Sequence, residues 1–322
     1  MNNKPRFKFA ILMLSLVLVA CSGGSAEAGC PEIDNREINV VATTPMIGEF
    51  VSQVGGDNIN LTVLMPPEAD PHTYDPAPQD AGKIADADLV FYTGLKYEPA
   101  ALIKLLENSA CSAEVLAEVG ENVFPIEFKE DDHDEEGHDD HAGHDHGAYD
   151  PHFWFDPNRV AYAAEYIESK LVEFDPSNAS DYEAAGKAYV TELKGLVGQV
   201  SELISTIPSQ NRKLITTHES LGYLEAKFGL EVLSTIIPSL DSANEISPSQ
   251  LVGVIDLIED NNVKVIFIEA EAPSVYAETI VAETGIRAVE GLWVETLKEG
   301  QSYPEFLFEA VELIVENLRN TD

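Results

Sequence analysis

The chain has 322 residues and a formal net charge of −38 at pH 7, because 57 Asp and Glu residues oppose only 19 Lys and Arg residues. This excess of negative charge excludes nucleic acid as a partner, since binding to a phosphate backbone depends on Lys and Arg. The length is sufficient for two domains of ordinary size, each able to bury a hydrophobic core.

The first 20 residues predict a lipoprotein signal peptide. Basic residues precede an apolar run at 11–20 that is too short to span a membrane. The sequence Leu-Val-Ala-Cys at 18–21 resembles a bacterial lipobox, which implies cleavage before Cys21 and acylation of its thiol. The small residues that follow predict a lipidated, flexible tether within 21–37. The mature protein is therefore expected to be anchored to a membrane without spanning it.

The two other cysteines, Cys30 and Cys111, would then lie in an oxidising compartment. A disulfide between them could persist there. Neither cysteine has the paired spacing of a zinc–thiolate site, so ligation of a metal by sulfur is not expected. The sequence alone leaves open whether the two are bonded.

Residues 38–157 alternate between strand and helix patterns and predict an N-terminal α/β lobe. The expected elements are strands at 38–44, 61–64, 89–94 and, more weakly, 123–124, with helices at 46–54 and 100–107. Nearly continuous apolar strands separated by helices are typical of a parallel, doubly wound sheet.

The loop after the second of these strands contains His72. Three closely spaced prolines, Pro66, Pro67 and Pro71, stiffen this loop and prevent regular structure. In open α/β sheets, ligands bind at the loops beyond the carboxyl ends of the strands. A lone surface histidine would mean little, but His152 and His218 occupy comparable positions. We therefore predict that His72 is a metal ligand.

The segment 130–146 contains nine acidic residues and five of the eight histidines. It has almost no apolar side chain to bury, so it predicts a mobile loop. Neutral imidazoles bind zinc well, and the acids concentrate divalent cations. The alternative is a solvated tract without a binding role. We predict an accessory metal site formed by His133, His138, His141, His144 and His146.

The sequence Asp-Pro-His-Phe-Trp-Phe-Asp-Pro at 150–157 carries His152, and a helical connection at 158–208 follows it. A first helix is expected at 158–174, with Asn158 as its N-cap. Apolar residues then recur at spacings of three and four from Tyr182 to Ile207, which predicts one long helix. At about 1.5 Å per residue it would be roughly 40 Å long, enough to act as a spine along both lobes.

Residues 209–322 repeat the first pattern and predict a C-terminal α/β lobe. Strands are expected at 213–217, 231–235, 263–268 and 286–289, with helices between them. His218 follows the first of these strands directly. Glu290 lies just beyond the fourth, so the same argument makes it the candidate carboxylate ligand. The predicted fold is thus α/β, with two doubly wound lobes of parallel sheet, one long spine helix, and a metal site in the cleft between the lobes.

Three neutral imidazoles and one carboxylate suit tetrahedral Zn²⁺, with bonds of about 2.0–2.2 Å. Mn²⁺ prefers more oxygen ligands and binds a nitrogen-rich site less tightly. Ligand histidines also need hydrogen-bond acceptors that fix their tautomers. The candidates in the sequence are Asp70, Asp150, Asp156 and Glu219.

The motifs at 70–74, 150–157, 217–220 and 267–285 resemble, in order, those of the zinc and manganese solute-binding lipoproteins of bacterial metal-uptake ABC transporters. The resemblance extends over the whole mature chain. It implies that His72 and His152 bind metal from the first lobe and His218 from the second, with a carboxylate completing the site.

The same resemblance bears on the choice of metal. Members with Glu at the third histidine position tend to bind manganese, so His218 favours zinc. The chain departs from the family pattern where Glu290 precedes Gly291, in place of Asp before Pro, and where Leu221 replaces an aromatic residue. Water is the alternative to Glu290 as fourth ligand.

We therefore predict a monomeric, extracytoplasmic lipoprotein, in the periplasm or on the outer face of the cell membrane. It would capture Zn²⁺ and deliver it to an ABC-type membrane permease. The alternatives are a manganese-binding member of the family and a surface lipoprotein that buffers zinc or mediates cell adhesion. A zinc hydrolase is disfavoured, because the sequence lacks a His-Glu-x-x-His helix, a Gly-x-Ser-x-Gly elbow and a phosphate-binding glycine loop.

Overall fold

The computed structural model describes residues 30, 33, 36–128, 149–261, 263–271 and 275–319. The predicted signal peptide, the lipidation site Cys21 and the five histidines of 130–146 lie outside these residues. Within them, no helix combines the length and the apolar character needed to cross a bilayer.

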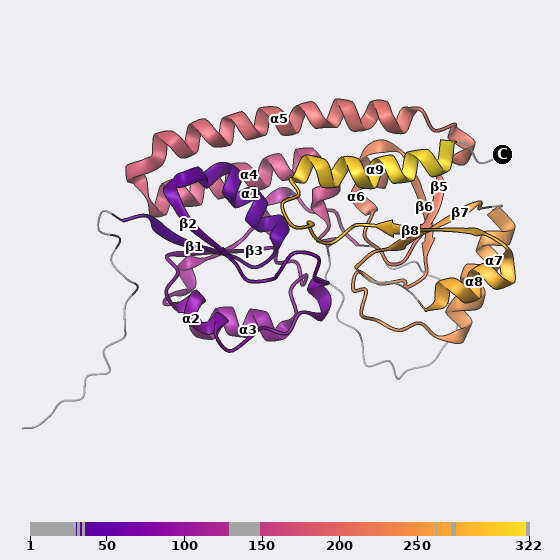
Figure 1. Ribbon diagram of the computed structural model, residues 1–322, viewed down its shortest axis with the longest axis horizontal. Coiled ribbons are helices and arrows are strands. Elements are labelled where there is room, and N and C mark those ends of the chain that lie inside the picture. The colour runs from indigo at the N-terminus through magenta and orange to yellow at the C-terminus, as the bar shows by residue number, and fades with distance from the viewer. Residues whose placement is uncertain are drawn as a thin grey trace, which may run out of the picture.

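The N-terminal lobe contains a parallel sheet with the strand order β2-β1-β3-β4. Its strands are β1 (Ile38–Ala42), β2 (Ile59–Val63), β3 (Leu89–Tyr92) and β4 (Leu116–Glu118). Helix α1 (Pro45–Gly55) covers one face, whereas α2 (Asp80–Ala85) and α3 (Ala100–Ser109) cover the other (Figure 1).

The strand expected at 123–124 is wrong, because Leu116–Glu118 takes the place beside β3. Val123 instead ends a 3-10 turn, Gly120–Val123. Phe124 has a left-handed backbone, with φ 55°, and its side chain is 65% exposed. An apolar pair at a turn has the same local sequence pattern as a short strand.

The C-terminal lobe repeats this topology with the strand order β6-β5-β7-β8, again entirely parallel. Its strands are β5 (Lys213–Thr216), β6 (Glu231–Thr235), β7 (Val265–Glu269) and β8 (Arg287–Leu292). Its helices are α6 (Gly222–Phe228), α7 (Pro248–Asn261), α8 (Tyr276–Thr284) and α9 (Tyr303–Arg319). The predicted α/β class with two parallel sheets is confirmed.

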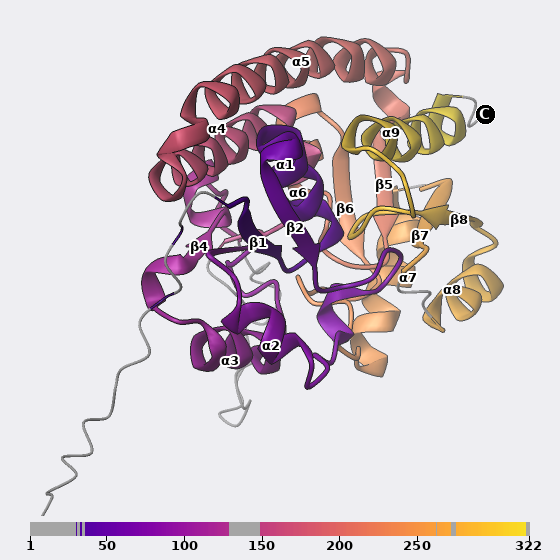
Figure 2. The same cartoon turned by 60° about the vertical axis from the view of Figure 1, so that its left-hand side comes forward.

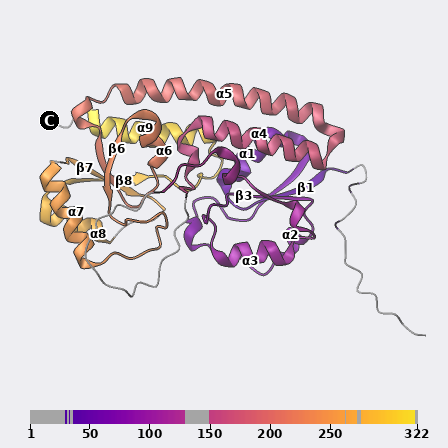
Figure 3. The same ribbon diagram turned by 180° about the vertical axis from the view of Figure 1, so that it is seen from behind.

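Two helices connect the sheets. The first, α4 (Pro157–Phe174), begins one residue before the position predicted. The prediction of Asn158 as its N-cap is wrong, because Asp156 is the N-cap and accepts a hydrogen bond from the Asn158 N–H at 3.0 Å. The second, α5 (Ala179–Ser205), is the long helix predicted from the apolar spacing, and its 27 residues span about 40 Å. It runs along both lobes, with α4 beside it (Figures 1 and 3).

The lobes share one hydrophobic core on the side of α5. This core contains side chains from α1, α4 and β1 of the first half together with α9, β5 and β7 of the second. Seen from the side, α1 and α9 both lie beneath α5 (Figure 2). On the opposite faces, each sheet has its own smaller core against α2 and α3 or against α7 and α8. The lobes are therefore joined along one side and packed separately along the other.

Cys30 and Cys111 form a disulfide, with their Cα atoms 5.0 Å apart. The sequence left open whether these two cysteines are bonded, and the structure shows that they are. The bond closes a sequence separation of 81 residues and fastens the N-terminal segment to the end of α3.

Removal of this bond by Cys111→Ser should lower the free energy of unfolding by about 2–4 kcal/mol, because a long loop is no longer constrained in the unfolded chain. Denaturant unfolding under non-reducing conditions measures the change. Addition of a reductant should destabilise the unsubstituted protein to the same extent and leave the variant unchanged. Equal stability of the two proteins under non-reducing conditions would contradict the expectation.

Candidate metal centre

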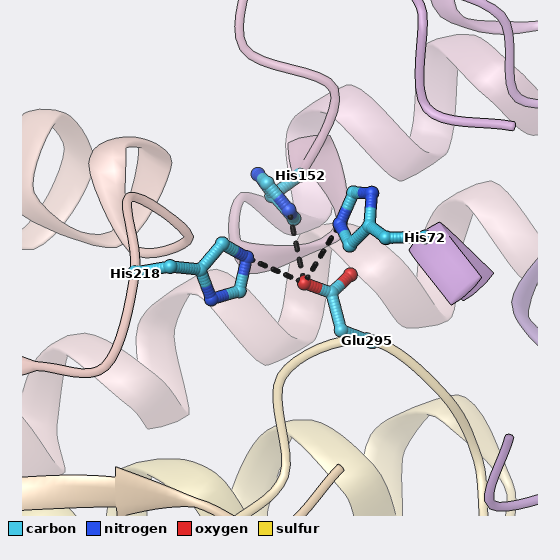
Figure 4. A group of neighbouring side chains, drawn as sticks. All are labelled: His72, His152, His218 and Glu295. Carbon is cyan, nitrogen blue, oxygen red and sulfur yellow. Dashed lines mark hydrogen bonds and ion pairs between the residues drawn. The ribbon is translucent and has the colours of Figure 1, made fainter. Parts of the chain in front are cut away.

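The three histidines outside the acidic segment meet between the two lobes (Figure 4). His72 lies in the short turn Pro71–Thr73, which follows β2. His152 precedes the turn Phe153–Phe155, and His218 follows β5. The structure thus brings together all three histidines singled out from the sequence.

The carboxylate that joins them is Glu295, and the prediction of Glu290 is wrong. Glu290 is an exposed residue within β8, where it pairs with Ile268. The strand continues to Leu292 through an irregularity at Gly291, whose φ is 90°. The carboxyl end of β8 therefore comes later than the sequence suggested. The apolar run at 292–294 is the signal that the buried segment continues past Glu290.

Oε1 of Glu295 is the point on which the imidazoles converge. It lies 3.3 Å from Nε2 of His72, 3.2 Å from Nε2 of His152 and 2.7 Å from Nε2 of His218. One potential ligand atom from each of the four residues lies within 4.8 Å of the others. Two imidazoles and Glu295 are completely buried, and the His72 side chain is only 4% exposed.

Two of these nitrogens are close to Glu295 without being hydrogen bonded to it. Nε2 of His72 and Nε2 of His218 are buried and have no hydrogen-bond partner among the described residues, although both are near Oε1. Both nitrogens are near Oε1, but their orientation does not allow a hydrogen bond to it. They therefore point toward the space beside the carboxylate. Buried polar atoms without partners are costly, and a cation in that space would satisfy them.

Carboxylates behind the rings orient two of the histidines. Nδ1 of His152 lies 2.8 Å from Oδ1 of Asp150, which also accepts the His152 backbone N–H at 2.8 Å. Nδ1 of His218 lies 2.5 Å from Oε2 of Glu269, and its backbone N–H lies 3.2 Å from Oε1. A proton held on Nδ1 leaves the Nε2 lone pair free for a metal.

The four acidic residues predicted as hydrogen-bond acceptors for the histidines have different roles in the structure. Asp150 has the predicted role, whereas Glu269 was not anticipated. Asp156 caps α4, and Glu219 accepts a hydrogen bond from the Thr235 hydroxyl. Asp70 accepts the backbone N–H of His72 at 2.9 Å and the hydroxyl of Ser242 from the other lobe at 3.2 Å.

Aromatic side chains of the N-terminal lobe fix the segment that carries Glu295. The Tyr97 hydroxyl lies 2.9 Å from Oε2 of Glu295 and 3.0 Å from its carbonyl oxygen. The Trp154 Nε1–H donates to the carbonyl of Val294 at 2.8 Å. The ring of Tyr97 also packs edge-on against His72 at 5.1 Å. These contacts join the two lobes directly at the site, and no sequence pattern indicates the role of Tyr97.

Burial and charge oppose each other in the pocket. Burial lowers the pKa of His152, but the charge of Glu295 and the hydrogen bond with Asp150 raise it to about 9. Burial likewise lowers the pKa of His218, but Glu269 and Glu295 raise it well above its usual range. For Glu295, burial raises the pKa, yet His152 and His72 bring it well below the usual range. The pocket therefore stabilises positive charge next to an ionised carboxylate.

Several known proteins are similar to this chain in sequence. Residues 40–317 match a family model described as zinc-uptake complex component A, periplasmic. The metal ABC transporter substrate-binding lipoprotein ScbA of Streptococcus cristatus is 28% identical, over 98% of this chain and 99% of its own. The manganese-binding lipoprotein MntA of Halalkalibacterium halodurans is 26% identical, over 88% of this chain and 87% of its own.

Structural comparison agrees on the fold. The periplasmic zinc binding protein TroA from Treponema pallidum matches with a TM-score of 0.75, covering 88% of this chain and 99% of that chain at 22% identity. The family model covers most of the chain, including all four residues of the cluster. The chain therefore belongs to the family of zinc-uptake complex component A, the metal-binding solute-binding proteins of ABC transporters, which are not enzymes.

Proposed function

We propose that this protein captures Zn²⁺ outside the cytoplasm and delivers it to an ABC-type membrane permease. The observation that carries the proposal is the convergence of three imidazole nitrogens and one carboxylate oxygen in a buried pocket. The zinc ligands would be Nε2 of His72, His152 and His218 and Oε1 of Glu295. In this protein the metal is cargo and not a catalytic cofactor.

The donor set favours zinc over manganese. Oε2 of Glu295 lies 2.9 Å from the Tyr97 hydroxyl, and the three imidazole nitrogens gather on Oε1, which favours binding of the metal through Oε1 alone. Three nitrogens and one oxygen make a four-coordinate site, which suits tetrahedral Zn²⁺. Mn²⁺ prefers oxygen ligands and more of them. Manganese is the second candidate, because several relatives are named manganese-binding or manganese ABC transporter lipoproteins, among them MntA and the PsaA proteins of Streptococcus mitis and Streptococcus anginosus.

Delivery requires that the site be opened, and the ligands are divided between the lobes in a way that allows this. His72 and His152 belong to the N-terminal half, whereas His218 and Glu295 belong to the C-terminal half. Zinc–ligand bonds are about 2 Å long, so a separation of the halves by roughly 1–2 Å would break the coordination of the metal. The shared core beneath α5 restricts such movement to small tilts. Docking on the permease would supply the energy for it.

The N-terminal lipid on Cys21 would keep the monomer at the membrane that holds its permease, in the periplasm or on the outer cell surface. The five histidines at 133, 138, 141, 144 and 146 would act as weaker accessory ligands that collect zinc near the pocket. Both elements lie outside the described residues and remain predictions from the sequence.

Competitive titration of zinc and manganese against a chelator tests the proposal, with Glu295→Ala compared to Glu290→Ala. The unsubstituted protein should have one tight site that prefers zinc. Glu295→Ala should weaken this site by about 100-fold or more, since even loss of a hydrogen-bond partner behind a ligand costs 10–100-fold. Glu290→Ala is the matched control and should bind zinc normally, because Glu290 is exposed and outside the cluster.

Equal effects of the two substitutions would refute the assignment of Glu295. A tight site that prefers manganese in the unsubstituted protein would refute zinc as the cargo.

Zinc affinity should also depend on pH. The raised pKa values mean that His152, with its value of about 9, and His218 hold protons in the metal-free pocket at neutral pH. Zinc needs the nitrogen lone pairs, so it must displace these protons. Apparent zinc affinity should therefore rise between pH 6 and 9, by up to about tenfold per pH unit for each displaced proton.

Calorimetry at pH 7 in buffers with different ionisation enthalpies measures the number of protons released. We expect at least one proton per zinc ion bound. An observed enthalpy that does not vary with the buffer, together with constant affinity from pH 6 to 9, would contradict this expectation.

A further inference from the structure

Glu271 lies two residues beyond the end of β7 and has no assigned role in the site. Its Oε1 accepts three successive backbone N–H groups, those of Val294 at 3.0 Å, Glu295 at 3.0 Å and Thr296 at 3.3 Å. All three of these residues are completely buried. Without Glu271 these buried N–H groups would lose their shared acceptor, which is costly.

The three hydrogen bonds curl the chain at the residue that carries the ligand. Successive N–H groups in an extended strand point in opposite directions, so three that meet on one oxygen require a compact turn. The middle one belongs to Glu295. Glu271 therefore determines the backbone position from which the Glu295 side chain enters the pocket.

The carbonyl groups of the same segment are held from the other lobe. Trp154 donates to the carbonyl oxygen of Val294, and the Tyr97 hydroxyl lies 3.0 Å from that of Glu295. The peptide groups at 294–295 are thus fixed by Glu271 on their N–H side and by the two aromatic residues on their C=O side. This leaves the carboxylate of Glu295 little freedom to leave the three imidazoles.

We propose that Glu271 is a positioning residue for the metal site and acts through the backbone of Glu295. Glu269, two residues earlier, holds Nδ1 of His218 at 2.5 Å. The segment 269–271, which begins at the last residue of β7, would then orient both ligands that the C-terminal lobe supplies. This inference rests on the proposed metal-binding function of the cluster.

The test compares Glu271→Ala, Glu271→Asp and Glu271→Gln in the mature protein, using zinc affinity and the visible absorption spectrum of bound Co²⁺. Glu271→Ala should weaken zinc binding by about 10–100-fold and alter the cobalt spectrum, because Glu295 shifts and the ligand geometry changes. Glu271→Asp withdraws the acceptor by one methylene and should have the same effects to a smaller degree. Glu271→Gln retains a side-chain oxygen that can accept the N–H groups, so it should restore most of the affinity and the original spectrum.

Asp88→Ala is the control for a merely structural role. Asp88 is also a buried carboxylate, and it accepts the backbone N–H of Asn39 at 2.7 Å. It precedes β3, so it lies at the amino end of this strand, away from the metal site at the carboxyl ends of the strands. Its substitution should lower the melting temperature and leave the cobalt spectrum and zinc affinity unchanged.

Unchanged affinity and an unchanged spectrum in Glu271→Asp would overturn the proposal, and so would the same result in folded Glu271→Ala. The proposal would also be overturned if Glu271→Gln weakened zinc binding as much as Glu271→Ala. The loss of the side-chain oxygen that accepts the three backbone N–H groups would then not be the cause. Failure of the proposed function gives a different result, namely no tight zinc site in the unsubstituted protein.

Discussion

The carboxylate of Glu295 is the group on which the site depends. It is completely buried, and three imidazole nitrogens lie within 3.3 Å of its Oε1. A buried, ionised carboxylate is stable only beside compensating positive charge. Protons on the histidines can supply that charge, and so can a metal ion. This equivalence explains how one pocket can be stable when empty of metal and still bind a cation tightly.

The two-lobed architecture puts these groups together from distant parts of the sequence. Both sheets have the same strand order. His72 lies in the turn after β2 and His152 precedes the turn before α4, whereas His218 and Glu295 follow β5 and β8. The core shared beneath α5 holds the lobes in register, while the opposite faces pack independently. A structure joined along one side can vary the distance across the site by small tilts without exposing its main core. This property suits a protein that must bind an ion firmly and then surrender it.

The sequence predicted the fold class and three of the four clustered residues for clear physical reasons. His72, His152 and His218 are the only histidines outside 130–146, and each was placed in a loop beside a strand or helix end. Strand alternation and apolar spacing likewise indicated the parallel sheets and α5. These features depend on local patterns, which a single sequence records.

The remaining features depend on tertiary structure. The position of Glu295 follows from the irregular pairing at Gly291, which extends β8 beyond the expected end and leaves Glu290 on the surface. Glu269 and Tyr97 act through contacts across long sequence separations, of 51 and 198 residues. No local pattern distinguishes such residues from other buried acids and aromatics. Their roles required the three-dimensional arrangement.

X-ray absorption at the zinc edge, on protein loaded with one zinc ion, tests the central claim most directly. Our account predicts four-coordinate zinc with three imidazole nitrogens and one carboxylate oxygen at about 2.0–2.2 Å. Loss of one oxygen scatterer in Glu295→Ala would complete the assignment. Five or six ligands dominated by oxygen, or a spectrum that Glu295→Ala does not change, would contradict it.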